Sequence, residues 1–307
     1  MNKIFIDGSA GTTGLRIVER LSERKDLELL ILPEELRKDP AARADALKSA
    51  DIAFLCLPDD AAKESVALAE NSKVKIIDTS TAHRTDPDWV YGMPELTGNR
   101  EKIKNSARIA NPGCHASGFI ALVAPLVEQG ILPKDAFLSC FSLTGYSGGG
   151  KKMIAQYEDT ARPGLYDAPR QYALGQSHKH LPEMANVCGI ENAPIFCPIV
   201  GDFYSGMEVT VPLFAHQIKG NLEDIRALYQ NYYSDGLIRF EDADADGLLS
   251  ACAYSGRDDM GVSVFGNGDR LILTARFDNL GKGASGAAVQ NMNLMLGFDE
   301  TTGLNVE

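Results

Sequence analysis

Apolar runs and helical stretches alternate along the first 80 residues of the chain. Apolar residues at positions 15, 17, 18 and 21 have the spacing of one helix face, and short apolar runs predict strands at 3–6, 27–32, 51–57 and 74–78. Strands that are apolar throughout are typical of a parallel sheet covered by helices on both faces. Because crossovers between parallel strands are right-handed, we predict an α/β fold that begins with a Rossmann-type, doubly wound parallel sheet.

The pattern changes after about residue 115. Helices are predicted near 119–129, 151–160 and 222–233, and longer strands at 137–144, 195–200, 207–215 and 270–277. Polar and apolar residues alternate in Met207-Glu-Val-Thr-Val, which indicates a strand with one exposed face. We therefore predict an α+β domain with a mostly antiparallel sheet, which serves substrate binding and dimerisation.

The domain boundaries depend on the last predicted helix, at 284–296. Its residues are small and apolar enough to pack back on the first domain. We therefore predict that residues 1–115 and 283–307 form the nucleotide-binding domain, and that residues 116–282 form the second domain.

Charge and composition restrict the partners. The chain has 30 Lys and Arg against 42 Asp and Glu, a net charge of −12, so its electrostatic field repels nucleic acid and anionic membranes. No apolar run approaches the ~20 residues of a membrane helix, and the first residues lack the pattern of a signal peptide. These features predict a cytoplasmic protein that acts on a small molecule and binds neither nucleic acid nor membranes.

The six cysteines lie at scattered positions without a CxxC pair, so neither a disulfide framework nor a metal site is predicted. Five of them lie in apolar stretches and are expected to be buried. The sixth, Cys114, follows Asn111-Pro-Gly and precedes a predicted helix. A thiol at a helix N-terminus sees the positive end of the helix dipole, which favours the thiolate. Cys114 is therefore the candidate nucleophile, and a buried structural cysteine at a turn is the alternative.

A glycine-rich loop directly follows the first strand and opens the first helix. Its spacing is GxxGxxG, where the usual dinucleotide fingerprint has GxGxxG. Glycines at this position let backbone N–H groups approach a pyrophosphate at the helix N-terminus. The predicted cofactor-binding residues of the loop are Gly8, Ser9, Gly11, Thr12, Thr13 and Gly14, and a tight turn without a ligand is the alternative.

The end of the second strand usually decides between NAD and NADP, because an acidic side chain there holds the ribose 2′-hydroxyl of NAD. In this chain Glu34 and Glu35 precede Arg37 and Lys38. Arg37 and Lys38 are candidates for the 2′-phosphate of NADP, and a solvated charge cluster is the alternative. These residues alone do not distinguish the two cofactors.

Two histidines form a second candidate site in the segment His178-Lys-His180-Leu-Pro-Glu183. Residues 178 and 180 would lie on the same side of an extended segment, where an imidazole can transfer a proton and Glu183 can orient it. Either histidine is a candidate acid or base, and His180 is favoured because it is nearer to Glu183. A metal-binding pair and surface histidines ahead of a helix are the alternatives.

A further glycine-rich segment, at 144–152, offers backbone amides and two cations. Ser147, Gly148, Lys151 and Lys152 are candidates for binding an anionic substrate there, and a flexible glycine-rich loop is the alternative. Arg84 is another candidate for the phosphate or carboxylate of the substrate.

Seven segments in order resemble the family of N-acetyl-γ-glutamyl-phosphate reductases, in its shorter form, over nearly the whole chain. They are Gly8–Gly14, Asp78–Arg84 (similar to D-x-S-x-x-x-R), Tyr91–Leu96 (Y-G-L-P-E-L), Asn111–Cys114, Ser142–Lys151, His178–Glu183 (H-x-H-x-P-E) and Asn279–Asn293. One position departs from the family, which commonly has an aromatic residue and Pro after its cysteine. This chain has His115-Ala-Ser, and His115 is a second imidazole beside the thiol.

The resemblance implies the fold shared by aspartate-semialdehyde and glyceraldehyde-3-phosphate dehydrogenases. It also implies the NADPH-dependent reduction of N-acetyl-γ-glutamyl phosphate through a thioester on Cys114, a step of arginine biosynthesis, in a homo-oligomer that is a dimer or tetramer. Reductases of aspartyl or aminoadipyl phosphate are the alternatives of the same class, and whether the substrate is carrier-bound is left open. A non-catalytic nucleotide sensor and a thiol hydrolase are alternatives of other classes. The first would have no need of Cys114 and the histidines, and the second would not explain the loop at residue 8.

Overall fold

The computed structural model describes residues 1–244 and 246–306. They form two units, one made of Met1–Pro112 and Ala284–Leu304 and the other of Gly113–Gly283 with the C-terminal residues from Asn305. The first unit therefore ends three residues before the predicted boundary at 115.

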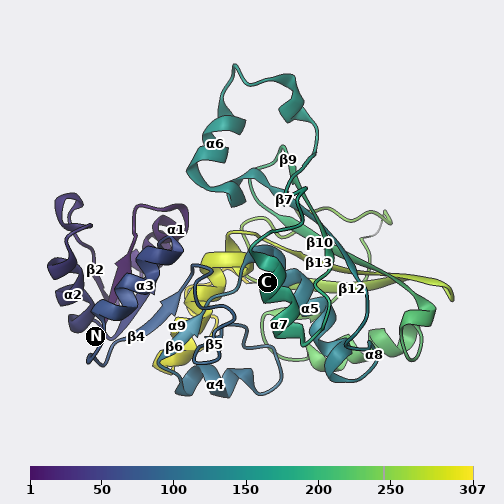
Figure 1. Cartoon of the computed structure of the whole chain (residues 1–307), viewed down its shortest axis with the longest axis horizontal. Coiled ribbons are helices and arrows are strands. Elements are labelled where there is room, and N and C mark those ends of the chain that lie inside the picture. The colour runs from purple at the N-terminus through teal and green to yellow at the C-terminus, as the bar shows by residue number, and fades with distance from the viewer. Residues whose placement is uncertain (245, 307) are drawn as a thin grey trace. The chain divides into compact units, whose positions relative to one another are not determined.

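The first unit contains a six-stranded sheet in the order β2-β1-β3-β4-β6-β5 (Figure 1). All of its pairings are parallel. The strands are β1 (Asn2–Asp7), β2 (Leu27–Leu30), β3 (Ile52–Leu55), β4 (Lys75–Asp78), β5 (Val90–Tyr91) and β6 (Arg108–Ala110). The helices are α1 (Thr12–Ser22), α2 (Pro40–Ser49), α3 (Asp59–Leu68), α4 (Asn99–Asn105) and α9 (Gly286–Leu296).

Side-chain alternation along β1 explains why helices cover both faces of this sheet. Ile4 and Ile6 belong to a buried cluster that includes side chains of α1 and α9, whereas Phe5 belongs to a second cluster with side chains of α2 and α3. The doubly wound parallel sheet and the packing of the last helix on it are thereby confirmed. The direction of winding reverses between β1 and β3, where open α/β sheets bind their ligands at the carboxyl ends of the strands.

The second unit contains a seven-stranded sheet in the order β11-β12-β13-β10-β7-β9-β8. Four of its pairings are antiparallel, and the β7–β9 and β11–β12 pairings are parallel. The strands are β7 (Ser139–Gly145), β8 (Arg170–Gln171), β9 (Ile195–Gly201), β10 (Met207–Phe214), β11 (Ile238–Phe240), β12 (Met260–Gly266) and β13 (Arg270–Phe277). The predicted mostly antiparallel sheet is therefore confirmed.

One face of this sheet is covered by helices. The helix α5 (Cys114–Glu128) is buried along nearly its whole length and contacts β10, β13, α7 (His180–Cys188) and α8 (Leu222–Tyr232). The segment between β7 and β8, which includes α6 (Gly150–Glu158), extends away from the sheet (Figure 1). Within the described part of the chain, no helix has the length and apolar character needed to cross a membrane.

The other face of the sheet carries a group of exposed apolar side chains. Along β10 the buried residues alternate with half-buried ones, and the strand ends at Phe214, which is exposed. Phe141 pairs with Thr210, and Ile272 pairs with Pro212, so both lie on the same face as Phe214. This exposed apolar surface, completed by Ile195, is referred to below as the open face.

Candidate active site

The glycine-rich loop of the first unit has the geometry of a nucleotide-binding turn. Gly8 has φ +86°, and a Cβ there would lie 2.3 Å from the carbonyl oxygen of Cys56, at the end of β3. A Cβ on Gly14 would lie 2.4 Å from the carbonyl oxygen of Gly8, so α1 packs directly on the loop. No side chain caps α1, whose N-cap is Gly11, so the first backbone N–H groups of the helix are left for an anion. The loop fits the pyrophosphate of a dinucleotide.

Gly14→Ala is expected to weaken the binding of a nicotinamide cofactor about 10-fold or more, because the new methyl group forces α1 away from Gly8. Overpacking of this kind also lowers the free energy of unfolding by about 1–3 kcal/mol. Fluorescence titration with NADPH and NADH, together with a thermal melt, measures both effects.

Gly268→Ala is the control, because its Cβ would meet no atom within 4 Å and Gly268 lies outside the nucleotide loop. Equal cofactor affinity in the two variants would contradict a role for the close contact at Gly14.

The charged residues after β2 lie outside the strand, in a turn. Residues Glu34–Leu36 make a short 3-10 turn, and the Arg37 guanidinium donates to the carbonyl oxygen of Leu32 at 3.4 Å. Lys38 is exposed. The structure places both basic side chains on the nucleotide-binding unit, and their contact with a 2′-phosphate stays a prediction.

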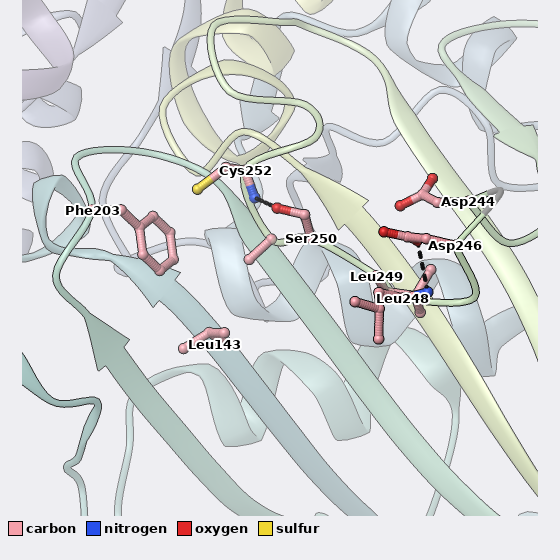
Figure 2. A pocket seen from close by; sticks show the side chains of 9 residues that line it. Leu143, Phe203, Asp244, Asp246, Leu248, Leu249, Ser250 and Cys252 are labelled. Atoms are coloured by element: carbon pink, nitrogen blue, oxygen red, sulfur yellow. Dashed lines mark hydrogen bonds between the residues drawn. The ribbon is translucent and has the colours of Figure 1, made fainter.

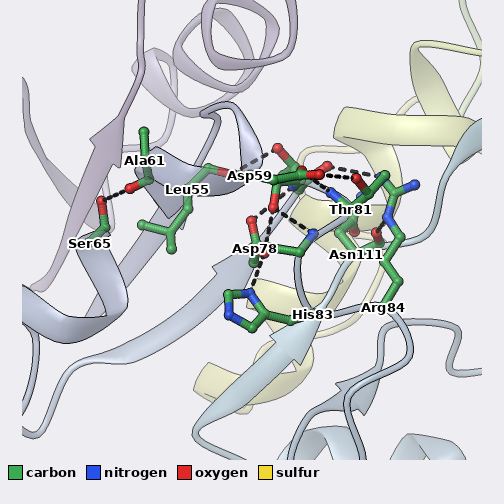
Figure 3. A network of polar contacts seen from close by, with 12 residues as sticks. Leu55, Asp59, Ala61, Ser65, Asp78, Thr81, His83, Arg84 and Asn111 are labelled. Carbon is green, nitrogen blue, oxygen red and sulfur yellow. Dashed lines mark hydrogen bonds and ion pairs between the residues drawn. The ribbon is translucent and has the colours of Figure 1, made fainter. Parts of the chain in front are cut away.

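A polar network joins the carboxyl ends of β3, β4 and β6 (Figure 3). The buried Asp78 carboxylate binds His83 Nδ1 at 2.6 Å and accepts the Ser80 hydroxyl at 2.7 Å. The Arg84 guanidinium donates to the carbonyl oxygens of Asn111, at 3.0 Å, and Thr79, at 2.9 Å. Arg84 therefore ties the loop after β4 to the end of β6, and a contact with substrate stays a prediction.

Cys114 is the first residue of α5, after a turn made by Pro112 and Gly113. The buried Glu183 carboxylate accepts the backbone N–H of Gly113 at 2.7 Å, so α7 holds the turn that presents the thiol. Gly283 lies against the same turn, because a Cβ there would be 3.0 Å from Cys114 Cβ. Sequence reasoning assigned Glu183 to the orientation of an imidazole, which stays a prediction. The structure shows a contact with the nucleophile turn.

Three imidazoles gather at this end of α5. The rings of His178 and His180 are 4.7 Å apart, and they lie 5.7 and 5.5 Å from the ring of His115. His178 Nδ1 accepts the backbone N–H of His180 at 3.2 Å, where α7 begins. His178 therefore uses one ring nitrogen to accept a hydrogen bond from the first residue of α7. The structure thus places His178 and His180 beside His115, the residue that follows Cys114.

His115 is buried and hydrogen-bonded through both ring nitrogens. Its Nδ1 lies 2.6 Å from the Ser142 hydroxyl on β7, and its Nε2 lies 2.7 Å from the Tyr172 hydroxyl after β8. Burial, and secondarily the neighbouring His178, lowers the pKa of His115 to about 3, so the ring is neutral at physiological pH. Sequence reasoning noted His115 but missed Ser142 and Tyr172 as its partners.

The buried neutral state of His115 predicts a loss of stability in acid. Its pKa is 6.5 when the side chain is solvated and about 3 in the folded protein, so the unfolded chain binds more protons between these values. The contribution of His115 is complete above about pH 6.5 and is lost as the pH falls toward 3. Between pH 7 and pH 5 this residue should remove about 2 kcal/mol of the free energy of unfolding.

Urea unfolding at pH 7, 6 and 5 measures this loss in the natural chain and in His115→Phe. The variant starts from a lower stability because it loses two hydrogen bonds, but its stability should fall less steeply with pH. An identical slope in the two proteins would show that His115 does not stay neutral.

The second glycine-rich segment lies at the end of β7 and the start of α6. The buried Ser147 hydroxyl accepts the Asn279 side-chain amide at 2.9 Å, and the exposed Gly148 follows it. Lys151 and Lys152 are exposed in the first turn of α6. The structure therefore places two cations on the same segment as Ser147 and Gly148, and their contact with a substrate phosphate stays a prediction.

A cavity of about 700 Å³ lies on the second unit (Figure 2). Leu143, which lines it, belongs to the open face of the sheet, whereas Ser142 belongs to the face that α5 covers. Cys252 is exposed at this cavity and Cys56 and Cys197 are half-buried, so of the five cysteines expected to be buried only Cys140 and Cys188 are. Among the residues that the structure describes, no group of three His, Cys, Asp or Glu side chains is placed to hold a metal ion.

Family models match most of the chain. The model of the semialdehyde dehydrogenase NAD binding domain matches residues 3–106, and that of the semialdehyde dehydrogenase dimerisation domain matches residues 114–279. The chain therefore belongs to the semialdehyde dehydrogenase family, so it is an oxidoreductase with a domain for a nicotinamide cofactor.

Within this family the chain is similar to enzymes named N-acetyl-gamma-glutamyl-phosphate reductase. The enzyme of Brucella suis is 49% identical over 306 residues, which cover 96% of this chain and 99% of the relative. The enzyme of Brucella ovis is 48% identical with the same coverage. The predicted family is thereby confirmed, and the relatives match this chain over nearly their full length.

Solved structures of aspartate semialdehyde dehydrogenases share the fold. Aspartate semialdehyde dehydrogenase II of Vibrio cholerae, complexed with ASA, has a TM-score of 0.72 at 18% identity and covers 96% of this chain and 98% of its own. The Francisella tularensis enzyme has a TM-score of 0.71 at 14% identity, with coverage of 95% and 99%. At these identities the likeness concerns the fold alone.

Proposed function

We propose that this enzyme reduces N-acetyl-γ-glutamyl phosphate to N-acetylglutamate 5-semialdehyde and phosphate, with NADPH and through a thioester on Cys114, in arginine biosynthesis. The observation that carries the proposal is the arrangement at the start of α5, where Cys114 opens the helix and His178 and His180 lie beside the next residue. The similarity to reductases of this name along the whole chain selects the acetylated substrate.

Cys114 acts as the nucleophile. Its thiolate attacks the carbonyl carbon of the acyl phosphate, the C–O bond to phosphate breaks, and inorganic phosphate leaves with that electron pair. A nicotinamide cofactor, when bound, supplies the hydride that reduces the resulting thioester to the level of an aldehyde. The hemithioacetal oxyanion then re-forms the carbonyl, the C–S bond breaks, and His180 protonates the leaving sulfur as the aldehyde is released.

The first turn of α5 is suited to stabilise negative charge on the reacting carbonyl oxygen. The first hydrogen bond within the helix runs from the Ser117 N–H to the carbonyl oxygen of Gly113, at 2.8 Å. The N–H groups of residues 114–116 precede that bond and are the backbone donors for the oxyanion.

The cofactor and phosphate contacts belong to the same proposal. Gly8, Ser9, Gly11, Thr12, Thr13 and Gly14 would hold the pyrophosphate of the cofactor, and Arg37 or Lys38 the 2′-phosphate that distinguishes NADP from NAD. Lys151 and Lys152, with the Ser147–Gly148 backbone, are proposed for the substrate phosphate. Arg84 is the weaker candidate, because its guanidinium already donates to two carbonyl oxygens. We also propose a cytoplasmic location, in keeping with six cysteines that form no disulfide within the described residues.

The test is the reverse reaction, followed as the reduction of NADP or NAD by the purified enzyme. N-acetylglutamate semialdehyde is compared with aspartate semialdehyde, each with and without phosphate. Phosphate-dependent reduction of NADP with the acetylated substrate alone supports the proposal. Turnover only with aspartate semialdehyde would keep the thioester chemistry and overturn the substrate, and faster reduction of NAD would overturn the cofactor.

We further propose that two chains associate through the open face of the second sheet to form a homodimer. The face carries exposed Phe141, Ile195, Phe214 and Ile272, and the matched model of this unit describes a dimerisation domain.

Phe141→Glu is expected to raise the dissociation constant of the dimer by about 100-fold or more, because a carboxylate would be buried twice in a two-fold interface. Analytical ultracentrifugation over a concentration series measures it. Phe137→Glu is the matched control, since Phe137 is 80% exposed and lies before β7 begins. Unchanged association of Phe141→Glu would place the interface elsewhere.

A further inference from the structure

A chain of three polar side chains runs from the interior of the second unit to the candidate active site. The Ser142 hydroxyl, which is 0% exposed, binds His115 Nδ1 at 2.6 Å, and His115 Nε2 binds the Tyr172 hydroxyl at 2.7 Å. Tyr172 is positioned by its backbone N–H, which donates to the carbonyl oxygen of Pro198 on β9 at 3.0 Å. The ring stands beside His178 as well, at 6.3 Å between centroids.

The direction of the hydrogen bonds follows from the burial of Ser142. A neutral imidazole carries one N–H, so His115 donates from one nitrogen and accepts at the other. Within residues 1–244 and 246–306, the Ser142 hydroxyl has no hydrogen-bond partner besides His115. If it accepted from Nδ1, its own hydrogen would be buried without an acceptor, which costs about 1–3 kcal/mol. Ser142 therefore donates to Nδ1.

The direction of these hydrogen bonds determines where the Tyr172 hydroxyl can donate its proton. With Nδ1 as the acceptor, Nε2 carries the proton and donates to the Tyr172 oxygen, so the Tyr172 O–H cannot be donated back to His115. Within the described residues, the Tyr172 hydroxyl has no other hydrogen-bond partner. Its proton is therefore available to an acceptor that is not part of the protein.

Tyr172 also reaches the residue next to the nucleophile, because its hydroxyl binds His115 Nε2 at 2.7 Å and His115 directly follows Cys114 in the chain. Burial raises the pKa of the Tyr172 hydroxyl, and the negative charge of Cys114 raises it further. The phenol therefore keeps its proton throughout the neutral range and is a hydrogen-bond donor there.

We propose that Tyr172 is a catalytic residue that donates a hydrogen bond to the oxyanion formed on Cys114, and that Ser142 and His115 are positioning residues that orient its hydroxyl. The oxyanion is the former carbonyl oxygen, which becomes negative when the thiolate adds to the acyl carbon and again when the thioester is reduced. The oxygen is separated from Sγ by one carbon atom, within reach of a donor beside Cys114. No proton is transferred in this contact, and a preorganised neutral donor of this kind stabilises the developing charge. The inference rests on the proposed function for its substrate.

Two reactions of Cys114, measured in the full-length enzyme without cofactor, distinguish loss of the Tyr172 hydrogen bond from a general disruption of the site. Acylation by p-nitrophenyl acetate passes through a tetrahedral oxyanion, whereas alkylation by iodoacetamide does not. Tyr172→Phe is expected to slow acylation, measured as the burst of p-nitrophenolate, by about 10- to 100-fold. The alkylation rate should stay within about two-fold of the natural enzyme, because the thiolate itself is unchanged.

Ser142→Ala and His115→Phe test the positioning residues. Each is expected to give a smaller loss than Tyr172→Phe, and neither should add to it in a double variant, because all three act through one hydroxyl. Ser142→Ala removes the first donor and keeps the imidazole, so it remains informative if His115→Phe does not fold. Tyr229→Phe is the control, since it removes a buried hydroxyl that donates to the carbonyl oxygen of Leu122 at 2.5 Å, away from Cys114.

The outcomes distinguish a failure of this inference from a failure of the proposed function. Unchanged acylation in Tyr172→Phe, or an equal fall in acylation and alkylation, would overturn the role of Tyr172. In turnover, Tyr172→Phe should lower kcat with little change in KM for the semialdehyde, which an altered binding pocket would not do. If the natural enzyme fails to turn over the acetylated substrate, the proposed function is wrong, while the comparison of acylation with alkylation still decides the role of Tyr172.

Discussion

Cys114→Ser is expected to lower the phosphate-dependent reduction of NADP by about 10³-fold or more. A serine hydroxyl is almost entirely protonated at neutral pH, whereas a thiol at a helix N-terminus supplies a thiolate. The substitution changes one atom and keeps the turn in place, because Glu183 binds the backbone N–H of Gly113, which the substitution leaves unchanged. The loss should therefore appear in kcat without a fall in thermal stability.

Steady-state assays with N-acetylglutamate semialdehyde measure the loss. Cys252→Ser is the matched control. Cys252 is exposed at a cavity that lies on the opposite face of the sheet from Ser142 and from the first turn of α5. Iodoacetamide labelling followed by mass spectrometry should also find the fastest-reacting thiol at Cys114. Activity of Cys114→Ser near that of the natural enzyme would remove the thioester from the mechanism.

The first unit and its loop could be predicted because the information is local. Strands buried on both faces give continuous apolar runs, and the glycines that the nucleotide loop needs are visible as residue types. Gly8 has a positive φ, and Gly14 leaves no room for a Cβ, so the requirement at each position concerns neighbours close in the chain or the next strand. Cys114 could likewise be recognised from the Pro-Gly turn before it and the helix after it, although Glu183 and Gly283, far along the chain, hold that turn in the structure.

The strand β12 was not predicted, because its pattern is interrupted. Gly261 and Ser263 occupy buried positions in a run that otherwise reads as apolar. A Cβ on Gly261 would lie 2.3 Å from the Glu241 carboxyl carbon and 2.5 Å from the Tyr254 hydroxyl. The glycine thus makes room for side chains from outside the strand, which a single-sequence pattern does not reveal.

The partners of His115 were missed for a related reason. Ser142 and Tyr172 are 27 and 57 residues from His115, and they are brought to it by the parallel pairing of β7 with β9 and the antiparallel pairing of β8 with β9. A serine in a strand and a tyrosine in a loop carry no distinctive spacing. The signals in the sequence were the departure at His115, since a second imidazole beside the thiol requires hydrogen-bond partners once it is buried, and Ser142, which opens one of the family-like segments.

His180→Asn is expected to lower kcat by about 10²- to 10³-fold, whereas His178→Asn should lower it by less than about 10-fold. General acid–base catalysis by one imidazole contributes effects of this size. The two histidines differ in the structure, because His178 Nδ1 already accepts the backbone N–H of His180 at the start of α7. Asparagine can replace that acceptor with its side-chain oxygen, as it does at helix N-termini, but it cannot transfer a proton at neutral pH.

The pH dependence of kcat separates the two roles further. A catalytic His180 should give a limb of the pH–rate profile that disappears in His180→Asn and persists in His178→Asn. His115 cannot account for that limb near neutral pH, because burial lowers its pKa to about 3. If His178→Asn instead removed the limb and most of the rate, the proton transfer would belong to His178, and its bond to the α7 backbone would have to open during turnover. Comparing the two variants at matched thermal stability decides between these assignments, since a role in that hydrogen bond alone changes the melting temperature and leaves the shape of the profile intact.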